Sequence, residues 1–439
     1  MSNAPAERLL HRLYDSSSHS EEQRLEDERR RCDEMLQAWQ TLDVASPEIW
    51  ASVPGRTELS GNHTDHQGGK VLAAAVDRDV LVCARKNASS RVRILSLGHG
   101  EILLEDLEDL EPKEEDRESS RSLVRGVFDY LRRHDIPVPG FNAVVHSRVG
   151  AGEGLSSSAA FTVLIGAIAS SLGDERSVQS PLFLAQAAQY AEQVHFGKPC
   201  GLMDQLACAG GGASLLDFQS SRPAVKSVDF DLSSIGYALA LLDTGSQHHD
   251  LTDAYAAVPE EMGSVAEHLL GLDDASDTKA RLIDVNEALL RSKIPELRQT
   301  FGDRAVLRCL HFFDENRRVE AQAEALQQGD LDRYLRLMDE SGRSSWTLLQ
   351  NVVPDGRVRH QEVAMALALT HGFLRDLRLE NPDDLGACRI HGGGFAGRIQ
   401  ILLPKSRIDA LRQTLEPIFG DGSVLVTGIR QQGVSVESA

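Results

Sequence analysis

The sequence lacks several features that would point to particular classes of protein. Aromatic residues make up only 5% of the 439 residues, and no two of the six cysteines form a CxxC pair, so a thiolate metal cluster is not expected. No stretch reaches the roughly 18–20 consecutive apolar residues of a membrane-spanning helix, and the N-terminal stretch has no apolar core of a signal peptide. We therefore expect a cytoplasmic protein with reduced thiols.

Basic residues are in clear deficit. Lys and Arg number 46 against 66 Asp and Glu, which gives a formal net charge of −20. Such a surface repels nucleic acids and anionic membranes, so neither is expected as a partner. A small phosphate ligand remains compatible with this charge, because backbone N–H groups and a few local cations can hold it.

The length and the order of patterns predict more than one domain. A chain of 439 residues exceeds one ordinary hydrophobic core. We expect an N-terminal helical arm over residues 1–45, one domain over 46–232 and a second over 233–439. Strand and helix patterns alternate without a regular βαβ period, which favours an α+β fold over a doubly wound α/β fold.

The expected elements follow from hydrophobic periodicity. Strands are predicted within residues 70–86, as a hairpin over residues 91–107, at 140–149 and within 384–404. Helices are predicted at 156–173, at 181–196 with Ser180 as N-cap and Gly197 as terminator, and around 255–270, 277–299, 315–327 and 331–350.

Residues 149–161, VGAGEGLSSSAAF, form a glycine-rich loop between a predicted strand and an apolar helix. Glycines allow the backbone to approach a ligand closely, and the start of a helix presents N–H groups and the positive end of its dipole. The pattern favours a phosphate-binding loop over a simple serine-capped turn. It is neither a Walker A motif nor a dinucleotide-binding fingerprint.

Two carboxylates stand in otherwise apolar surroundings. Glu192 lies in the predicted helix of residues 181–196, and Asp204 lies in the stretch CGLMDQLACAGGG. A carboxylate in such surroundings is costly unless it is paired. Phosphoryl transfer usually requires Mg²⁺ and acidic or hydroxyl ligands, although an exposed helix position for Glu192 and a capping role for Asp204 are equally open on the pattern alone.

Several stretches taken together resemble the galactokinases, a family of the GHMP small-molecule kinases. Residues 54–72, PGRTELSGNHTDHQGGKVL, are similar to the galactokinase sugar motif PGRVNLIGEHTDYNGGxVL. Residues 147–160, SRVGAGEGLSSSAA, are similar to the GHMP nucleotide motif, and residues 191–211 to AEHxxxGxPCGIMDQxxxxxG. Residues 387–403 resemble the third motif, RxTGGGFGGCxVxLV, and residues 337–345 resemble LMxESHxSL. The motifs stand in family order.

The resemblance implies a two-domain GHMP kinase fold with the active site in the cleft between the domains. It implies phosphorylation of a sugar at its anomeric hydroxyl by ATP and Mg²⁺, with Asp204 as catalytic aspartate, Arg56 beside it, and Ser158 and Glu192 as Mg²⁺ ligands. The residues expected to contact the sugar are Asn62, His63, Asp65 and Tyr255. The residues expected to bind ATP are Gly150, Gly152, Gly154, Leu155, Ser156, Ser157 and Ser158, and the third-motif loop is Gly392, Gly393 and Gly394.

The sequence departs from the family pattern at the sugar motif. Asn62 replaces a glutamate, His66 replaces a tyrosine and TELS replaces VNLI. In the nucleotide motif Glu153 replaces a small residue, and because a carboxylate beside a phosphate is unfavourable we expect its side chain to point outward. These changes leave the sugar itself open, since a site built for one hydroxyl can reject close analogues.

Three functions compete. The first is a galactokinase, or a sugar 1-kinase that acts on N-acetylgalactosamine, arabinose or a uronic acid. The second is a non-catalytic galactose-binding regulator, against which the intact Arg56, Asp204 and Glu192 argue. The third is a GHMP kinase for a non-sugar alcohol, against which the HTDH and CGLMDQ stretches argue. We expect a monomer or a small homo-oligomer.

Overall fold

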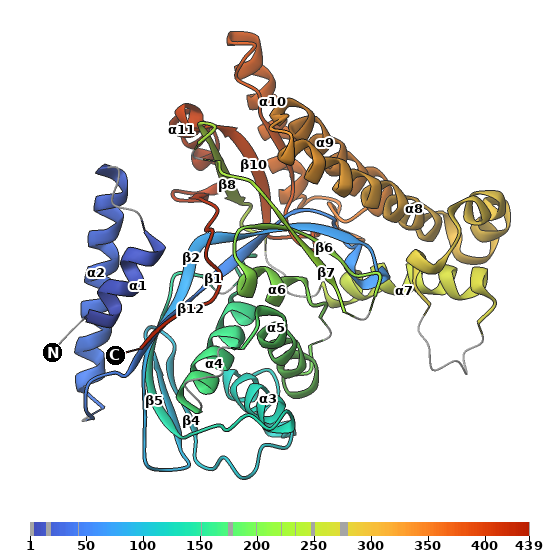
Figure 1. Ribbon diagram of the computed structural model, residues 1–439. Coiled ribbons are helices and arrows are strands. Elements are labelled where there is room, and N and C mark those ends of the chain that lie inside the picture. The colour runs from blue at the N-terminus through green and yellow to red at the C-terminus, as the bar shows by residue number, and fades with distance from the viewer. Residues whose placement is uncertain are drawn as a thin grey trace. The chain divides into compact units, whose positions relative to one another are not determined.

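The computed structural model describes residues 4–14, 19–42, 44–150, 152–173, 179–198, 200–220, 222–232, 234–246, 251–272 and 280–438 (Figure 1). The chain forms two compact units of mixed helices and strands. Unit 1 comprises Met1–Arg56, Ala75–Gly211 and Arg430–Ala439, and unit 2 comprises Thr57–Ala74 and Gly212–Ile429.

These units divide the chain differently from the predicted domains, which followed one another along the sequence. The predicted arm belongs to unit 1, residues 57–74 belong to unit 2, and the last ten residues return to unit 1. The reason is the length of two strands, β1 (Ile49–Ser60) and β2 (Lys70–Lys86), each of which starts in one unit and ends in the other.

Unit 1 contains a mixed sheet whose strands lie in the order β12, β1, β2, β5, β3, β4. Strand β5 pairs antiparallel with β2 and parallel with β3, while β3 and β4 form the predicted hairpin. The strands not yet delimited are β3 (Val92–Ser96), β4 (Gly100–Leu104), β5 (Phe141–Ser147) and β12 (Ser435–Ser438). The helices are α1 (Ala4–Leu13), α2 (His19–Gln40), α3 (Ser120–Arg133), α4 (Ser157–Gly173), α5 (Pro181–Tyr190) and α6 (Met203–Gly210), with short turns at Glu114–Asp116 (η2) and Ala191–Phe196 (η3).

The arm formed by α1 and α2 covers one face of this sheet, and α3 to α6 lie on the other side (Figure 1). Leu9 and Trp39 of the arm belong to one buried cluster with Trp50, Leu81 and Val144 of the sheet. Because alternate strand residues point to opposite faces, this cluster takes one face of β1, β2 and β5. The arm is thus part of the core of unit 1.

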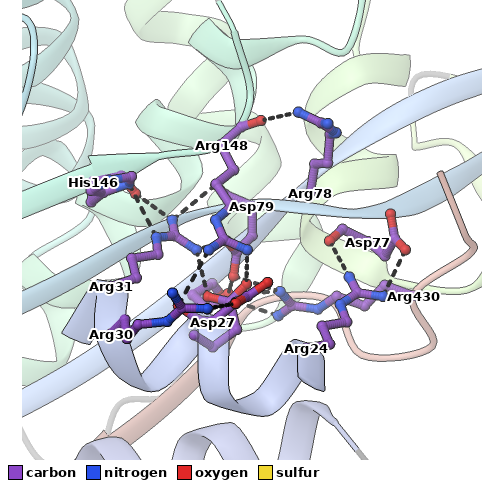
Figure 2. Close-up of polar contacts among 12 residues, drawn as sticks. Arg24, Asp27, Arg30, Arg31, Asp77, Arg78, Asp79, His146, Arg148 and Arg430 are labelled. Atoms are coloured by element: carbon purple, nitrogen blue, oxygen red, sulfur yellow. Dashed lines mark hydrogen bonds and ion pairs between the residues drawn. The ribbon is translucent and has the colours of Figure 1, made fainter. Parts of the chain in front are cut away.

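A buried ionic cluster adds to this attachment. Figure 2 shows Arg31 of α2 and Arg430 of the C-terminal segment converging on Asp79 of β2, which is only 2% exposed. Arg31 Nη1 lies 2.6 Å and Arg430 Nη1 lies 3.1 Å from the carboxylate oxygens, and the Ser52 hydroxyl also donates to it. Arg31 pairs with Glu28 as well, at 3.0 Å. Burial acts to raise the pKa of Asp79, but the two guanidinium groups outweigh it and hold the pKa well below its usual value.

The same cluster lies beside two segments of the candidate site. One precedes the glycine-rich loop of residues 149–161, and the other follows Asp204 in the chain. The Arg148 N–H donates to the Asp79 carbonyl at 2.8 Å, directly before the glycine-rich loop. Beyond Arg430, the Val434 N–H donates to the carbonyl of Ala209 in α6 at 3.1 Å. Backbone hydrogen bonds therefore link the ionic cluster and the C-terminal segment to the chain on either side of the candidate site of unit 1.

Unit 2 is built around an antiparallel sheet in the order β11, β8, β10, β9. One face packs on α10 and α11, and residues of the other face pack with α8 and α9. The start of β2 pairs with β6, which pairs with β7. The strands are β6 (Ala213–Asp217), β7 (Ala224–Val228), β8 (Tyr237–Asp243), β9 (Ala387–Ile390), β10 (Arg398–Pro404) and β11 (Val424–Thr427). The helices are α7 (Thr252–Leu270), α8 (Glu287–Gln327), α9 (Leu331–Ser344), α10 (Glu362–Glu380) and α11 (Ile408–Phe419), with short turns at Asp65–Gln67 (η1), Leu282–Asp284 (η4), Ser345–Leu349 (η5) and Lys405–Arg407 (η6).

The predicted elements are largely confirmed, with differences in unit 2. Helix α4 ends at Gly173 and α5 is capped by Ser180, as expected. Helix α8 consists of two helices joined at Gly302, whose backbone is not helical, so two helices are present as predicted, but the second begins before residue 315. The predicted start of the first helix at 277–279 lies outside the described residues. Helix α10 was not predicted. None of the described helices has the length and apolar character that a bilayer crossing needs.

Candidate active site

The glycine-rich loop that is predicted to bind phosphate, called the phosphate loop below, connects β5 to α4. Gly152 and Gly154 adopt φ angles of 77° and 73°, in the left-handed region that glycine enters without strain. Leu155 is completely buried, and its carbonyl accepts from the Arg56 N–H at 3.0 Å, which fixes the loop to β1. Ser157 and Ser158 begin α4, so the helix N-terminus follows the loop directly.

Glu153 does not point outward, contrary to our expectation. Its Oε2 accepts from the Gly150 N–H at 3.0 Å, within the loop itself. The physical reason is local: the carboxylate satisfies a backbone donor of the tight turn that Gly150 and Glu153 close, where the Glu153 N–H donates to the Gly150 carbonyl at 3.2 Å.

Asp204 and Arg56 meet in unit 1. Arg56 Nε lies 2.8 Å from Asp204 Oδ1, and Arg56 Nη1 donates to the Gly154 carbonyl at 2.6 Å. The Ser156 hydroxyl donates to Asp204 Oδ2 at 2.7 Å. Burial acts to raise the pKa of Asp204, but the charge and hydrogen bond of Arg56 and the Ser156 hydroxyl keep the pKa below its usual value. Asp204 is therefore an ionised carboxylate joined directly to the phosphate loop.

Glu192 is buried in a π-helical turn, η3, rather than on an exposed helix position. The residue is 2% exposed, and its Oε1 has no hydrogen-bond partner among the described residues. Lys198 Nζ is 4.0 Å from Oε2. Burial raises the pKa of Glu192, Lys198 opposes this rise, and nearby Asp204 adds to it. The nearby Ser158 side chain, like Lys198, acts to lower the pKa of Glu192.

Sequence reasoning missed the residues that hold this turn against α3. Asp129 accepts from the Tyr190 hydroxyl at 2.6 Å and lies 3.2 Å from His195 Nε2. Gly126 allows the close approach, because a Cβ there would lie 2.7 Å from the Ala191 Cα. Asp129 lies outside the motifs and His195 lies within residues 191–211, so only their contact in the structure identifies their role.

The sugar-motif loop lies in unit 2 between the end of β1 and the start of β2. The Thr64 hydroxyl is within hydrogen-bond distance of the carbonyls of Gly61, at 2.9 Å, and Lys70, at 2.6 Å, so it joins the two ends of the loop. Gly61 has a φ of 99°, and a Cβ there would lie 2.6 Å from the Lys70 carbonyl oxygen. Asp65 opens the short η1 turn of this loop.

Three of the predicted sugar-binding side chains donate to three successive carbonyls of the third-motif loop. Asn62 donates to Gly392, His63 Nε2 lies 2.8 Å from the Gly393 oxygen, and the Tyr255 hydroxyl donates to Gly394 at 2.6 Å. Each partner is a carbonyl, which only accepts, so the His63 Nε2 carries the proton in this contact. The structure thus brings Asn62, His63, Tyr255 and the three glycines together.

The two histidines of the sugar-motif loop are neutral at physiological pH. Burial lowers the pKa of His63 to about 4. Burial, with a contribution from His63, lowers the pKa of His66 to about 3. Both ring nitrogens of His66 are buried and have no hydrogen-bond partner among the described residues. Neutral imidazole can donate to or accept from a hydroxyl.

A buried polar layer supports the backbone of this loop. Glu315 of α8 is completely buried and accepts from the Ser60 hydroxyl at 3.1 Å, the Gly61 N–H at 3.2 Å and the Ser341 hydroxyl at 2.6 Å. His311 lies 2.9 Å from the Asn62 carbonyl. Ser341 belongs to the LMDESGRSS stretch, and Glu315 and His311 were missed because no motif contains them.

Within the described residues, no group of three or more His, Cys, Asp or Glu side chains forms a ready metal site. The unpartnered, buried Oε1 of Glu192 beside the Ser158 hydroxyl nevertheless fits a divalent cation of the kind that takes most of its remaining ligands from water and phosphate oxygens.

Comparisons with known proteins agree with this geometry. Residues 40–86 match the family model described as the galactokinase galactose-binding signature, and residues 122–212 match that of the GHMP kinases N terminal domain. Among solved structures, Lactococcus lactis galactokinase complexed with galactose has a TM-score of 0.71 at 22% identity and covers 88% of this chain and 95% of its own. The mevalonate kinase of Methanococcus jannaschii has a TM-score of 0.59 at 13% identity, covering 88% and 98%. The fold is that of the GHMP kinases.

Curated relatives narrow this class. The galactokinase of Glaesserella parasuis is 30% identical over 368 residues, which are 82% of this chain and 87% of that protein. The galactokinase of Chloroflexus aurantiacus is 31% identical over 395 residues, or 88% and 90%. The chain belongs to the galactokinase family.

Proposed function

We propose that this protein is a sugar 1-kinase that transfers the γ-phosphoryl group of ATP to the anomeric hydroxyl of galactose. One observation supports the proposal above the others: the Asp204 carboxylate is held ionised by Arg56 and Ser156, and Arg56 also binds the phosphate loop. An ionised acceptor fixed beside a phosphate-binding loop is what in-line transfer to a hydroxyl requires.

The proposed roles follow from the contacts. Asp204 accepts the hydrogen bond of the anomeric hydroxyl and takes its proton as the oxygen–phosphorus bond forms. Arg56 keeps Asp204 ionised and offsets negative charge on the transferring phosphoryl group. Gly150, Gly152, Gly154 and the residues 155–158 would hold the nucleotide phosphates through backbone N–H groups and the start of α4.

Mg²⁺ would be held by Glu192 and Ser158. When bound, the ion neutralises charge on the phosphates and so lowers the barrier to transfer. The buried Glu192 carboxylate has an oxygen without a protein partner, which a cation would satisfy. Lys198 lies near the same carboxylate and opposes the rise of its pKa, which favours the ionised form that a cation requires.

His63, Asp65 and Tyr255 are the proposed sugar contacts. The side chains of His63 and Tyr255 already meet the third-motif loop, so we assign that loop the role of placing them. A sugar other than galactose is the second candidate, and the replacement of the family glutamate by Asn62 favours it. The cytoplasmic location stays a prediction.

The decisive assay measures ADP release from ATP and Mg²⁺ with galactose, N-acetylgalactosamine, glucose, arabinose and galacturonate. Asp204→Asn preserves size and removes the acceptor charge, so we expect kcat to fall by about 10²–10⁴. Asp409→Asn is the matched control, because its side chain is 89% exposed. Full activity of Asp204→Asn would refute the mechanism, and turnover of another sugar in preference to galactose would correct the substrate.

A further inference from the structure

Asn62 occupies a predicted sugar-binding position, yet all the hydrogen-bonding groups of its side chain have partners within unit 2. It is completely buried, and its Nδ2 donates to Glu58 Oε1, at 3.2 Å, and to the Gly392 carbonyl. Its Oδ1 accepts from Asn351 Nδ2 at 2.6 Å and from the Ser345 hydroxyl at 3.4 Å. A primary amide has two donors and two acceptor sites, so none remains for a sugar hydroxyl.

The orientation of this amide is determined by its neighbours. The carboxylate of Glu58 and the carbonyl of Gly392 can only accept, and both lie on the same side of Asn62 as Nδ2. A carboxylate in place of Asn62 would face two acceptors and could donate to neither. The surroundings therefore select an amide at position 62.

The carboxylate that contacts the Asn62 amide belongs to Glu58, four residues earlier in the chain. Its Oε1 lies 3.0 Å from Arg389 Nη2. Arg389 is completely buried in β9, and Glu58 is its one ion-pair partner among the described residues. A buried guanidinium without a partner carboxylate is strongly unfavourable, so Glu58 is committed to Arg389. In the galactokinase motif the amide and the carboxylate stand in the opposite order, Asn at the position of Glu58 and Glu at the position of Asn62.

We propose that the carboxylate and the amide have exchanged positions between residues 58 and 62, and that Asn62 therefore takes no part in binding the sugar. One sugar hydroxyl then receives no hydrogen bond from position 62. This inference rests on the proposed function. The enzyme then accepts galactose and also hexoses that lack the hydroxyl facing position 62. A site that hydrogen-bonds a hydroxyl rejects the deoxy analogue by about 10⁴–10⁵, whereas a site without such a bond discriminates little.

The test compares kcat/KM for galactose with that for 2-deoxy-, 3-deoxy-, 4-deoxy- and 6-deoxygalactose, all of which keep the anomeric hydroxyl. For the natural protein we expect kcat/KM for one analogue to lie within about tenfold of the value for galactose. The values for the other three analogues should be lower than that for galactose by more than about 10³-fold. The double variant Glu58→Asn with Asn62→Glu keeps one carboxylate and one amide. In this variant, kcat/KM for that same analogue should decrease at least about 100-fold relative to kcat/KM for galactose.

The single variants serve as matched controls for the pairing. Asn62→Glu places two carboxylates within hydrogen-bond distance, where one must be protonated, and Glu58→Asn leaves Arg389 without a carboxylate. Both singles should melt at lower temperatures than the double variant. If the decreases in melting temperature of the two single variants instead add up in the double variant, the two positions are independent and the proposal is wrong.

Two further outcomes decide the matter. If kcat/KM of the natural protein is lower for all four analogues than for galactose by more than about 10³-fold, another group hydrogen-bonds the hydroxyl and the inference is wrong. If galactose itself is not phosphorylated, the proposed function fails, and calorimetric binding of galactose and the four analogues to the natural protein still tests the inference, because one analogue should bind as galactose does. That binding measurement also decides the case if the double variant does not fold.

Discussion

Replacing Asp79 with asparagine tests whether the buried ionic cluster attaches the arm to the core of unit 1 (Figure 2). Asn keeps the shape of the side chain and removes the charge that Arg31 approaches to 2.6 Å and Arg430 to 3.1 Å. Breaking a buried ion pair from one side costs about 3–5 kcal/mol. Because Arg31 keeps Glu28 as a partner, we expect about 3 kcal/mol, at the lower end of that range.

The assay is thermal unfolding followed by circular dichroism. For a unit of roughly 200 residues, each kcal/mol corresponds to about 2–4 °C, so the melting temperature of unit 1 should fall by about 6–12 °C at pH 7. Asp27→Asn is the matched control in α2, since its side chain is 46% exposed and its ion pair with Arg30 lies at the surface. Its loss should stay within about 0.5 kcal/mol.

The pH dependence of this difference has a defined sign. The folded-state pKa of Asp79 is lowered, so its stabilising contribution is fully present above the unfolded pKa of about 3.9 and is lost as the pH falls further. The natural protein and Asp79→Asn should therefore converge in stability below about pH 4. Equal melting temperatures of Asp79→Asn and Asp27→Asn at pH 7, or a difference that grows in acid, would refute the reasoning.

Two further predictions concern the π-helical turn. Glu192→Gln removes the charge proposed to hold Mg²⁺, so binding of Mn²⁺ to the enzyme–ADP complex, measured by electron paramagnetic resonance, should weaken at least about tenfold; Glu114→Gln, with a side chain 83% exposed, should not change it, and equal binding in both variants would remove Glu192 from the metal site. Gly126→Ala places a Cβ 2.7 Å from the Ala191 Cα and should cost about 1–3 kcal/mol in a urea unfolding experiment. Gly263→Ala in α7, where a Cβ meets nothing within 4 Å, should not destabilise the protein, and similar losses in both would argue against tight packing of the turn on α3.

Local patterns were sufficient for the elements whose signals lie close together in the chain. The glycine-rich loop between a strand and an apolar helix, the Ser180 cap and the β3–β4 hairpin all depend on residues within a few positions of one another, and the structure has each of these elements. Helix α10 was missed, and so was the part of α8 between residues 303 and 314. In both, the apolar positions pack against partners distant in sequence, and the spacing alone does not reveal that packing.

The sequence by itself predicted the residues of the candidate motifs, because a ligand that is held by a short loop imposes residue types on consecutive positions. Only the tertiary structure decided what their side chains do. The Asn62 side chain makes its hydrogen bonds with Glu58, Gly392 and Asn351. The Glu153 carboxylate accepts a hydrogen bond from the Gly150 N–H. Hydrogen-bond capacity is divided among neighbours in space, most of them far apart in the chain, and no pattern within one motif records that division.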